Sequence, residues 1–295
     1  MSKAGRSASV QYSHKGFRIS FARTQVMGIV NVTPDSFSDG GKYHDPAQAL
    51  AHARRLAQQG ADIIDIGGES SRPGAAPTSV EEELARVIPV VRALAKSISH
   101  IPISIDTYKP EVAAAALAEG AVMINDISGL RNPAMASLAA KTKAPVVVMH
   151  MKGTPQNMQR NPTYKDVVAE VKEFFLERIK TLGRMGVKKI ILDPGIGFGK
   201  TANHNLMLLN RLEEIAALGY PLLVGLSRKS FIGKALGADT EDRETGGVAA
   251  NAIAIAKGAR IIRVHDAGLG RQTAIMADCI RLGKKPVDRR GQTGP

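Results

Sequence analysis

Eight short apolar runs recur along the chain, each followed by a polar loop and a segment with helical periodicity. The runs are rich in β-branched residues and too short for helices, which is typical of buried strands. They cover residues 26–30, 62–66, 101–105, 121–124, 145–149, 189–192, 222–226 and 260–264. Regular strand-then-helix alternation favours parallel strands with right-handed crossovers, and eight strands close a barrel. The pattern predicts an α/β fold of the (β/α)8 TIM-barrel type, with an open doubly wound sheet as the alternative.

Residues that typically begin and end helices occur in the segments between these runs. Ser79–Glu82 and Thr163–Asp166 have the spacing of a capping box, and Pro110 stands where the first turn of a helix tolerates proline. Four glycines each follow a helical segment and precede an apolar run, as helix C-caps do: Gly60, Gly120, Gly186 and Gly219. No linker interrupts the alternation, which indicates one domain.

The two ends of the chain differ from this repeating part. Residues 1–12 have the composition of a disordered leader, and residues 284–295 that of a disordered basic tail. The barrel domain is therefore expected over residues 13–283. Its first segment, 12–21, is expected to form a hairpin that closes the bottom of the barrel.

Composition is typical of a globular protein in a reducing compartment. Of its 295 residues 44% are hydrophobic, yet no run approaches the ~18 consecutive apolar residues of a membrane span. The first residues lack the apolar segment of a signal peptide. Cys279 is the single cysteine, which excludes an internal disulfide framework. We therefore expect a cytoplasmic protein with no membrane partner.

The net charge of +13 is concentrated at the two ends. Residues 1–24 carry +5 and residues 281–295 carry +4, so the part between them carries only +4. A nucleic-acid surface would combine clustered Lys and Arg with aromatic residues, but aromatic residues make up only 4% and tryptophan is absent. The modest excess in the middle suits a small anionic substrate, and no nucleic-acid partner is expected.

Polar residues occupy the end of every predicted strand, where a (β/α)8 barrel carries its active site. These positions hold Asn31, Glu69, Ser70, Ser71, Arg72, Asp106, Asn125, Asp126, His150, Asp193, Ser227, Arg228, Lys229, Arg263, His265 and Asp266. The opposite strand ends carry mostly Gly, Ala, Lys and Pro, so we predict the site at the first rim. The connections 31–43 and 67–77 exceed the usual ~2–6 residues and are expected to act as lids.

The stretch 192–200 delivers one carboxylate, Asp193, to the tip of a buried strand. Three glycines after it allow a sharp turn and a close approach of the backbone to a ligand. Gly199 to Thr201 resembles the end of a Walker A motif, but the first glycine of that motif would fall at Pro194. We therefore expect Asp193 to accept hydrogen bonds from an amidine-like ring edge, with a helix-capping role as the alternative.

These motifs resemble, in order, those of the dihydropteroate synthase family, over roughly residues 12–285. The motifs lie at 31–41, 67–74, 104–110, 124–127, 192–200, 225–231 and 263–266. One departure occurs at Ser71, where the family commonly has threonine, and the hydroxyl is kept. The resemblance implies a transferase of folate biosynthesis. It would join p-aminobenzoate to 6-hydroxymethyl-7,8-dihydropterin pyrophosphate, giving 7,8-dihydropteroate and pyrophosphate.

The resemblance also implies a pterin pocket at the rim. Its implied residues are Asp106, Asn125, Ile127, Met149, Asp193, Lys229 and Arg263. Asp193 would bind the amino-pyrimidinone edge, and Lys229 would donate to the ring carbonyl oxygen and N5. Arg263 would stack its planar guanidinium on the ring. The apolar residues Met149 and Ile127 would form walls, although either could equally be plain core.

A pyrophosphate site is implied beside it. Its residues would be Asn31, Ser71, Arg72, Arg263 and His265. Asn31 is also the implied protein ligand of Mg2+, an ion that keeps most of its waters and bridges phosphate oxygens. An asparagine after a strand is, however, more often a turn residue. His265 is expected to donate to phosphate and not to act as a general base.

The implied reaction begins with loss of pyrophosphate, which leaves a delocalised cation on the pterin methylene. Asp106 is the candidate carboxylate that stabilises this cation, with Asp35 on the first loop as a second and Lys229 as a further catalytic residue. p-Aminobenzoate would then attack in a pocket formed by Phe37, Pro73, Phe198, Lys229 and Ser230. Sulfonamides, which mimic p-aminobenzoate, are expected to bind there. Members of the family form homodimers, so a homodimer is expected.

Three other functions compete with this one. A pterin-binding barrel that transfers a methyl group to a corrinoid protein would share the pterin pocket but lack the pyrophosphate loops and Lys229. A catalytically silent pterin-binding homologue would not need intact loops and Asp106. A generic phosphate-binding barrel enzyme would not need Asp106, Asn125 and Asp193 together.

Overall fold

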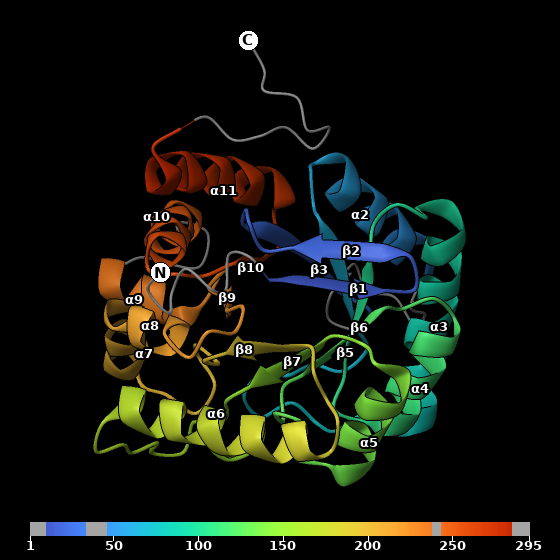
Figure 1. Cartoon of the computed structure of the whole chain (residues 1–295), viewed down its shortest axis with the longest axis horizontal. Helices are drawn as coiled ribbons and strands as arrows, with labels where there is room; N and C mark the ends of the chain where they lie inside the picture. Colours follow the sequence, from blue (N-terminus) through green and yellow to red (C-terminus); the bar gives the residue numbers. More distant parts are fainter. Residues whose placement is uncertain (1–9, 34–45, 238–242, 285–295) are drawn as a thin grey trace.

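Eight parallel strands form the large sheet of the protein, which the computed structural model describes over residues 10–33, 46–237 and 243–284 (Figure 1). The strands are β3 (Gln25–Asn31), β4 (Ile63–Gly67), β5 (Ile103–Asp106), β6 (Met123–Asp126), β7 (Val146–Met149), β8 (Ile190–Asp193), β9 (Leu223–Gly225) and β10 (Ile261–Val264). Their order in the sheet is β8-β7-β6-β5-β4-β3-β10-β9. A parallel bridge between Leu192 and Leu222 joins β8 to the start of β9 and closes the sheet. The predicted (β/α)8 barrel is confirmed, because each of the eight apolar runs forms a strand.

Helices follow the strands and form the outer layer around the sheet (Figure 1). They are α2 (Pro46–Gln58), α3 (Val80–Ser97), α4 (Pro110–Ala118), α5 (Pro133–Thr142), α6 (Val167–Arg184), α7 (Ala202–Asn210), α8 (Leu212–Ala216), α9 (Ser230–Leu236), α10 (Arg243–Ala256) and α11 (Ala267–Leu282). Their buried apolar faces and the outward side chains of the strands share one large core. Within the described ranges, no helix is long and apolar enough to cross a membrane.

The inside of the barrel is layered, because side chains alternate between the two faces of a strand. The lower layer is a single apolar cluster that includes Met27, Ile63, Met123, Val147, Ile191, Leu223 and Ile261. Two residues further along the same faces, the upper layer carries Asp65, Asn125, Asp193 and Arg263. The period of two therefore puts a dry floor directly below a polar layer.

The N-terminal hairpin closes the bottom of the barrel, as predicted, and Figure 1 looks onto it. Its strands β1 (Gln11–His14) and β2 (Phe17–Ser20) pair antiparallel. Tyr12, Ile19 and Phe21 belong to the apolar floor cluster, and the Tyr12 hydroxyl donates to the carbonyl of Ile190 at 2.8 Å. Gln11 and Tyr12 are therefore part of the fold, which corrects the expectation of a disordered leader at these two residues. Residues 1–9, and the expected tail from residue 285 onward, lie outside the described residues.

Two of the predicted helix starts are confirmed. Ser79 and Glu82 form a capping box at the start of α3. The Glu82 N–H donates to the Ser79 hydroxyl at 3.1 Å, and the Ser79 N–H donates to the Glu82 carboxylate at 3.4 Å. Pro110 is the first residue of α4. The four glycines predicted at helix ends all have positive φ. At Gly120, with φ +117°, an added Cβ would also lie 2.6 Å from the Cβ of Ala95.

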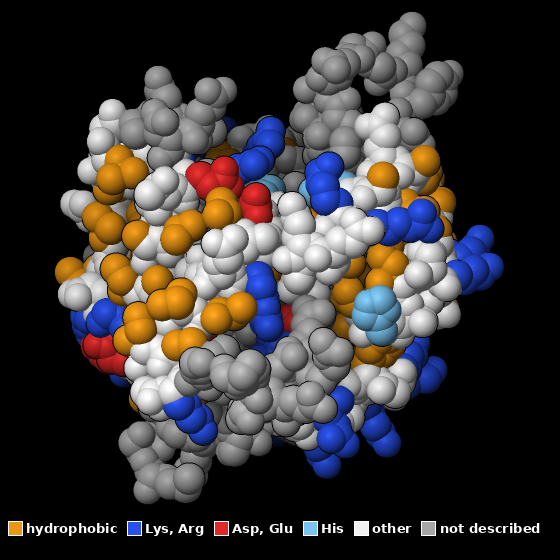
Figure 2. Space-filling view, turned by 90° about the horizontal axis from the view of Figure 1, so that it is seen from above, with side chains coloured by type: hydrophobic (Ala, Val, Ile, Leu, Met, Phe, Trp, Pro, Cys, Tyr) orange, Lys and Arg blue, Asp and Glu red, His pale blue; other side chains and the backbone are white. Residues whose placement is uncertain are grey.

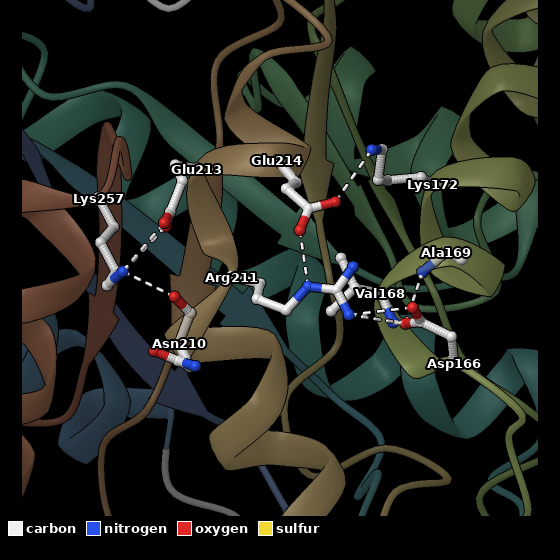
Figure 3. A network of polar contacts seen from close by, with 9 residues as sticks. All are labelled: Asp166, Val168, Ala169, Lys172, Asn210, Arg211, Glu213, Glu214 and Lys257. Atoms are coloured by element: carbon white, nitrogen blue, oxygen red, sulfur yellow. Dashed lines mark hydrogen bonds and ion pairs between the residues drawn. The ribbon is translucent and has the colours of Figure 1, made fainter.

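The capping box expected at Thr163–Asp166 is wrong, because Asp166 itself caps α6. Its carboxylate accepts from the backbone N–H groups of Val168 at 2.9 Å and Ala169 at 3.1 Å. The same carboxylate accepts from Arg211 at 2.9 Å, and Arg211 also donates to Glu214 at 2.6 Å (Figure 3). Exposed ion pairs of this kind contribute only ~0–1 kcal/mol each. Their effect is to tie the start of α6 to the α7–α8 junction.

The hairpin floor makes a testable prediction about stability. Ile19 and Arg18 are neighbours on β2, with Ile19 buried in the floor cluster and Arg18 exposed. We expect Ile19→Ala to lower the free energy of unfolding by ~2–4 kcal/mol, because it removes buried methyl groups and leaves a cavity. Arg18→Ala should change it by less than ~0.5 kcal/mol. Urea unfolding followed by circular dichroism measures both, and equal effects would contradict the role of the hairpin as part of the core.

Candidate active site

A cavity of about 960 Å³ opens at the carboxyl ends of the strands. It is lined by most of the predicted site residues: Asn31, Ser71, Arg72, Asp106, Asn125, Ile127, Met149, Asp193, Phe198, Lys229, Arg263 and His265. Pro73 and Ser230 are exposed and, among the described residues, are not part of this lining. Asp35 and Phe37 lie outside the described residues.

A buried ion-pair network forms the floor of the cavity. Arg263 donates through Nε to Asp65 at 2.6 Å and through Nη2 to Asp106 at 2.7 Å. The Asn125 amide donates to the same Asp65 oxygen at 2.9 Å. These residues lie on β10, β4, β5 and β6, so the contact crosses the barrel interior. One guanidinium thus holds two carboxylates in place.

Burial dominates the electrostatics of this network. Burial raises the pKa of Asp106 against the opposing charge of Arg263, and with the added effect of Asp65 the pKa reaches about 7. Burial alone would lower the pKa of Arg263, but Asp65 and Asp106 outweigh it, so the net shift is upward. Arg263 therefore keeps its proton, and Asp106 can change its charge near neutral pH.

Asp65 supports the site through Arg263 and was not among the residues predicted from the sequence. Its side chain is fully buried, and its Oδ1 makes no hydrogen bond within the described part of the chain. The signal was a charged residue inside the apolar run Ile63 to Ile66, where a strand buried on both faces normally has none. A mid-strand carboxylate needs a buried cation, and Arg263 supplies it.

Asp193 stands at the tip of β8, as predicted. Its Oδ1 accepts from the N–H of Gly195 at 2.7 Å, and burial raises its pKa to about 6. The glycines that follow make the predicted sharp turn, because Gly195, Gly197 and Gly199 all have positive φ. Gly195 has φ +64°, and an added Cβ would lie 2.0 Å from the carbonyl oxygen of His150. An added Cβ at Gly199 would lie 2.4 Å from the carbonyl oxygen of Lys152, so both glycines allow this loop to pack against the loop after β7.

Lys200 holds the same two loops together and is buried. Its Nζ lies 2.9 Å from Nδ1 of His150 and donates to the carbonyls of Gly195 at 3.0 Å and Phe198 at 2.9 Å. Burial and the charge of Lys200 together lower the pKa of His150 to about 2, so the imidazole is neutral and Nδ1 can accept. Lys200, which resembled the lysine of a Walker A motif, therefore links these two loops.

Lys229 and Phe198 form one side of the cavity. The Lys229 Nζ lies 4.2 Å from the centroid of the Phe198 ring, a cation–π contact. Burial lowers the pKa of Lys229 to about 8. The predicted apolar walls Met149 and Ile127 belong, with Phe198 packed against them, to a small separate apolar cluster.

His265 is a neutral hydrogen-bonding group. Its Nδ1 lies 3.0 Å from the hydroxyl of Ser227. Burial and the charges of Arg228 and Arg263 together lower its pKa to about 3. At neutral pH it can therefore donate a hydrogen bond to an anion but adds no charge of its own.

No set of metal-binding side chains is visible in the described ranges, where no three His, Cys, Asp or Glu residues are grouped to hold a metal ion. Asn31, the predicted Mg2+ ligand, ends β3 and lines the cavity. An amide oxygen is a ligand type that Mg2+ accepts, but the remaining ligands would have to be water and substrate phosphate. The residues present fit an ion that arrives with a phosphorylated substrate.

Comparisons with known proteins identify the family of the chain. Residues 27–265 match the family described as pterin binding enzyme. The dihydropteroate synthase of Escherichia coli is 50% identical over 254 residues, which cover 85% of this chain and 90% of that protein. The dihydropteroate synthase of a Synechocystis strain is 50% identical over 262 residues, covering 88% of this chain and 90% of that protein.

Solved structures give the same result. A Yersinia pestis dihydropteroate synthase with a sulfonamide drug complex superposes with a TM-score of 0.87 at 45% identity, covering 93% of this chain and 100% of that one. A Xanthomonas albilineans dihydropteroate synthase in complex with 7,8-dihydropteroate superposes with a TM-score of 0.84 at 44% identity, covering 92% and 99%. The chain therefore belongs to the dihydropteroate synthase family of pterin binding enzymes.

Proposed function

We propose that this chain condenses 6-hydroxymethyl-7,8-dihydropterin pyrophosphate with p-aminobenzoate, releasing pyrophosphate and 7,8-dihydropteroate in folate biosynthesis. The observation that carries the proposal is the convergence of Asp106, Asn125, Asp193, Lys229 and Arg263 on one cavity. The Xanthomonas albilineans relatives were solved with 7,8-dihydropteroate and with 4-aminobenzoic acid, which supports this choice of product and acceptor.

The pterin fits the buried end of the cavity. Asp193 would accept from the amino-pyrimidinone edge of the ring, beside the amide of Asn125. Lys229 would donate to the ring carbonyl oxygen and N5, because it is the charged donor on that wall. Met149 and Ile127 would cover the ring faces with apolar surface. Arg263 lies under the ring position, although its guanidinium is already paired with carboxylates.

The reaction follows from charge. The bond between the pterin methylene and the bridging oxygen breaks, and its electron pair leaves with pyrophosphate. A delocalised cation remains, and the Asp106 carboxylate would stabilise it from a position that needs no reorganisation. The arylamine nitrogen then forms the new bond to the methylene and loses a proton. Asp35, the second candidate carboxylate, stays a prediction.

The acceptor pocket is proposed beside Phe198 and Lys229, which line the outer wall. An aromatic ring and a cation suit a flat arylamine with a carboxylate. Sulfonamides have the same shape and would compete there. The roles of Phe37, Pro73 and Ser230 in this pocket stay predictions from the family resemblance.

Asn31 is proposed as the residue that would hold Mg2+ beside the substrate pyrophosphate. When bound, the ion would neutralise phosphate charge and favour departure of the leaving group. The chain's own donors for pyrophosphate are then Ser71, Arg72 and His265, with Arg263 deeper in the cavity. The cytoplasm stays the predicted location of the protein.

A test of the activity compares the wild-type chain with Asp106→Asn. We expect wild type to release pyrophosphate only when dihydropterin pyrophosphate, p-aminobenzoate and Mg2+ are all present. Asp106→Asn keeps the side-chain size but removes the negative charge, so kcat should fall by about 100- to 1,000-fold. A coupled assay for pyrophosphate measures both rates.

Binding of 6-hydroxymethylpterin to each variant, measured by calorimetry, controls for loss of the pocket. Tight pterin binding by wild type without any pyrophosphate release would refute the synthase activity and favour a catalytically silent homologue. An Asp106→Asn variant as fast as wild type would refute the role of the carboxylate alone.

The pH dependence of kcat/KM for dihydropterin pyrophosphate should be bell-shaped. Burial raises the pKa of Asp106 to about 7, so the carboxylate that stabilises the cation is lost as pH falls through that value. Burial lowers the pKa of Lys229 to about 8, so its protonated donor is lost as pH rises through that value. The maximum should lie between these two values.

Lys229→Arg tests the assignment of the alkaline limb, since a guanidinium stays protonated at high pH. The residual activity of this variant should keep the acid limb and lose the alkaline limb. An alkaline limb that persists near pH 8 would assign it to another group.

We also propose that two copies of the chain associate through α10 and α11. Ile253, Met276 and Ile280 are apolar and 55%, 59% and 77% exposed on these helices. Figure 2 looks onto the side where α11 lies in Figure 1, and apolar side chains gather on its left half. Such a concentration of exposed apolar side chains is typical of an interface.

Sedimentation velocity tests the association with a matched pair of variants. Ile280→Asp should convert a dimer into a monomer, because it places a charge in the proposed interface. Leu176→Asp, at a 56% exposed position on α6, should leave the dimer intact. A wild-type monomer at micromolar concentration would overturn the proposal.

A further inference from the structure

Two arginines without an assigned role line the cavity on one side. Arg55 comes from α2, and Arg228 comes from the loop between β9 and α9. Both are exposed at the cavity mouth, whereas Arg263 lies deeper and is only partly exposed. Within the described ranges, neither Arg55 nor Arg228 pairs with a carboxylate, in contrast to Arg263.

A relay of hydrogen bonds holds Arg55. The carbonyl oxygen of Ile29 lies 3.2 Å from Nε2 of His52, and a carbonyl can only accept, so Nε2 carries the proton. Nδ1 of His52 is then an acceptor, and Arg55 donates to it through Nη2 at 2.8 Å. The relay runs from the wall of the barrel to the guanidinium, which is thereby positioned at the cavity before any ligand binds.

Arg228 is held in a different way. Its backbone has φ +60°, the left-handed region that residues other than glycine seldom adopt. Strain of this kind concentrates where a side chain must be aimed at a ligand. Arg228 immediately precedes Lys229, the N-cap of α9. The same turn therefore places Lys229 at the wall of the pterin pocket and Arg228 at the mouth of the cavity.

The charges on this side are predominantly positive. Burial lowers the pKa of His52, and the charges of Arg55 and Arg228 lower it further, which places both guanidinium groups near the same imidazole. Two acidic residues, Asp266 and Glu69, line the cavity outside its deep end, and both already have partners: the Asp266 carboxylate accepts from the Leu269 N–H at 2.8 Å to cap α11, and the Glu69 carboxylate accepts from Lys109 at 2.6 Å. Two like charges facing one cavity without an acidic partner favour binding of an anion.

We propose that Arg55 and Arg228 form a second anion subsite, which binds the distal phosphate of the pyrophosphate group. The proposal rests on the proposed function, which puts the pterin at the deep end of the cavity. The phosphate further from the pterin methylene then lies toward the mouth, where these two guanidinium groups are. They make or break no covalent bond and act on substrate binding and on retention of the pyrophosphate product.

Neighbouring arginines on α2 provide a matched test. Arg54 and Arg55 are both exposed, but Arg54 is not part of the cavity lining among the described residues. Arg55→Leu and Arg54→Leu remove the same charge from the same helix. We expect Arg55→Leu to weaken binding of inorganic pyrophosphate about 10-fold, because charge-assisted hydrogen bonds to phosphate are lost. Arg54→Leu should change the affinity by less than twofold.

Isothermal titration calorimetry with inorganic pyrophosphate measures this without turnover, and 6-hydroxymethylpterin serves as a second probe. Its affinity should be the same in both variants, because it lacks the phosphates. In the assay of wild type and variants, the KM for dihydropterin pyrophosphate should rise in Arg55→Leu while the KM for p-aminobenzoate stays unchanged.

Equal pyrophosphate affinities in Arg55→Leu and Arg54→Leu would overturn the subsite. A wild-type chain that binds pyrophosphate but releases none would refute the proposed function alone.

Discussion

The ion pairs of Arg263 with Asp65 and Asp106 are the interaction on which the site depends. Each of the three groups would be unfavourable alone inside a barrel, since a buried charge without a partner loses its hydration. Together they balance one another's charge across three strands. Removing the arginine would leave two buried carboxylates facing each other, and one of them would have to bind a proton. The three charged groups of the upper layer therefore depend on one another, because each would be buried without a partner if the others were absent.

This arrangement is possible because the floor below it is dry and closed. The apolar cluster around Met27 and Ile63 separates the ion pairs from the bottom of the barrel, and Tyr12 seals it from outside. With water excluded from below, the ion pairs keep their strength, and polar groups above can face only the cavity. The hairpin, far from the chemistry, thus supports the low-dielectric surroundings that raise the pKa of Asp106.

Much of this could be predicted from the sequence, because period-two strands and glycine-rich loops are local patterns. The eight strands, the closing hairpin, the Ser79 cap and most residues of the cavity followed from such patterns or from the motifs of the family. The helix start at Asp166 could not be separated from Thr163, since both residues are good caps and a partner distant in sequence, Arg211, also binds the aspartate. Asp65 was missed for a similar reason. Its partner Arg263 lies 198 positions away, and only the closed barrel brings them together.

The charges of the cavity are distributed unequally, and this distribution matches the proposed reaction. Asp106 and Asp193 lie at the deep end, with Asp65 behind Arg263, while Arg55, Arg72 and Arg228 lie on the side that opens to solvent. Loss of pyrophosphate separates charge along this direction, with a cation left on the pterin and an anion leaving toward the arginines. An electric field already oriented for that separation stabilises the transition state more than the bound substrate. It therefore lowers the free-energy barrier of the reaction. The same field explains why His265 is best kept neutral: a further cation close to Arg263 would oppose the positive charge that develops on the pterin.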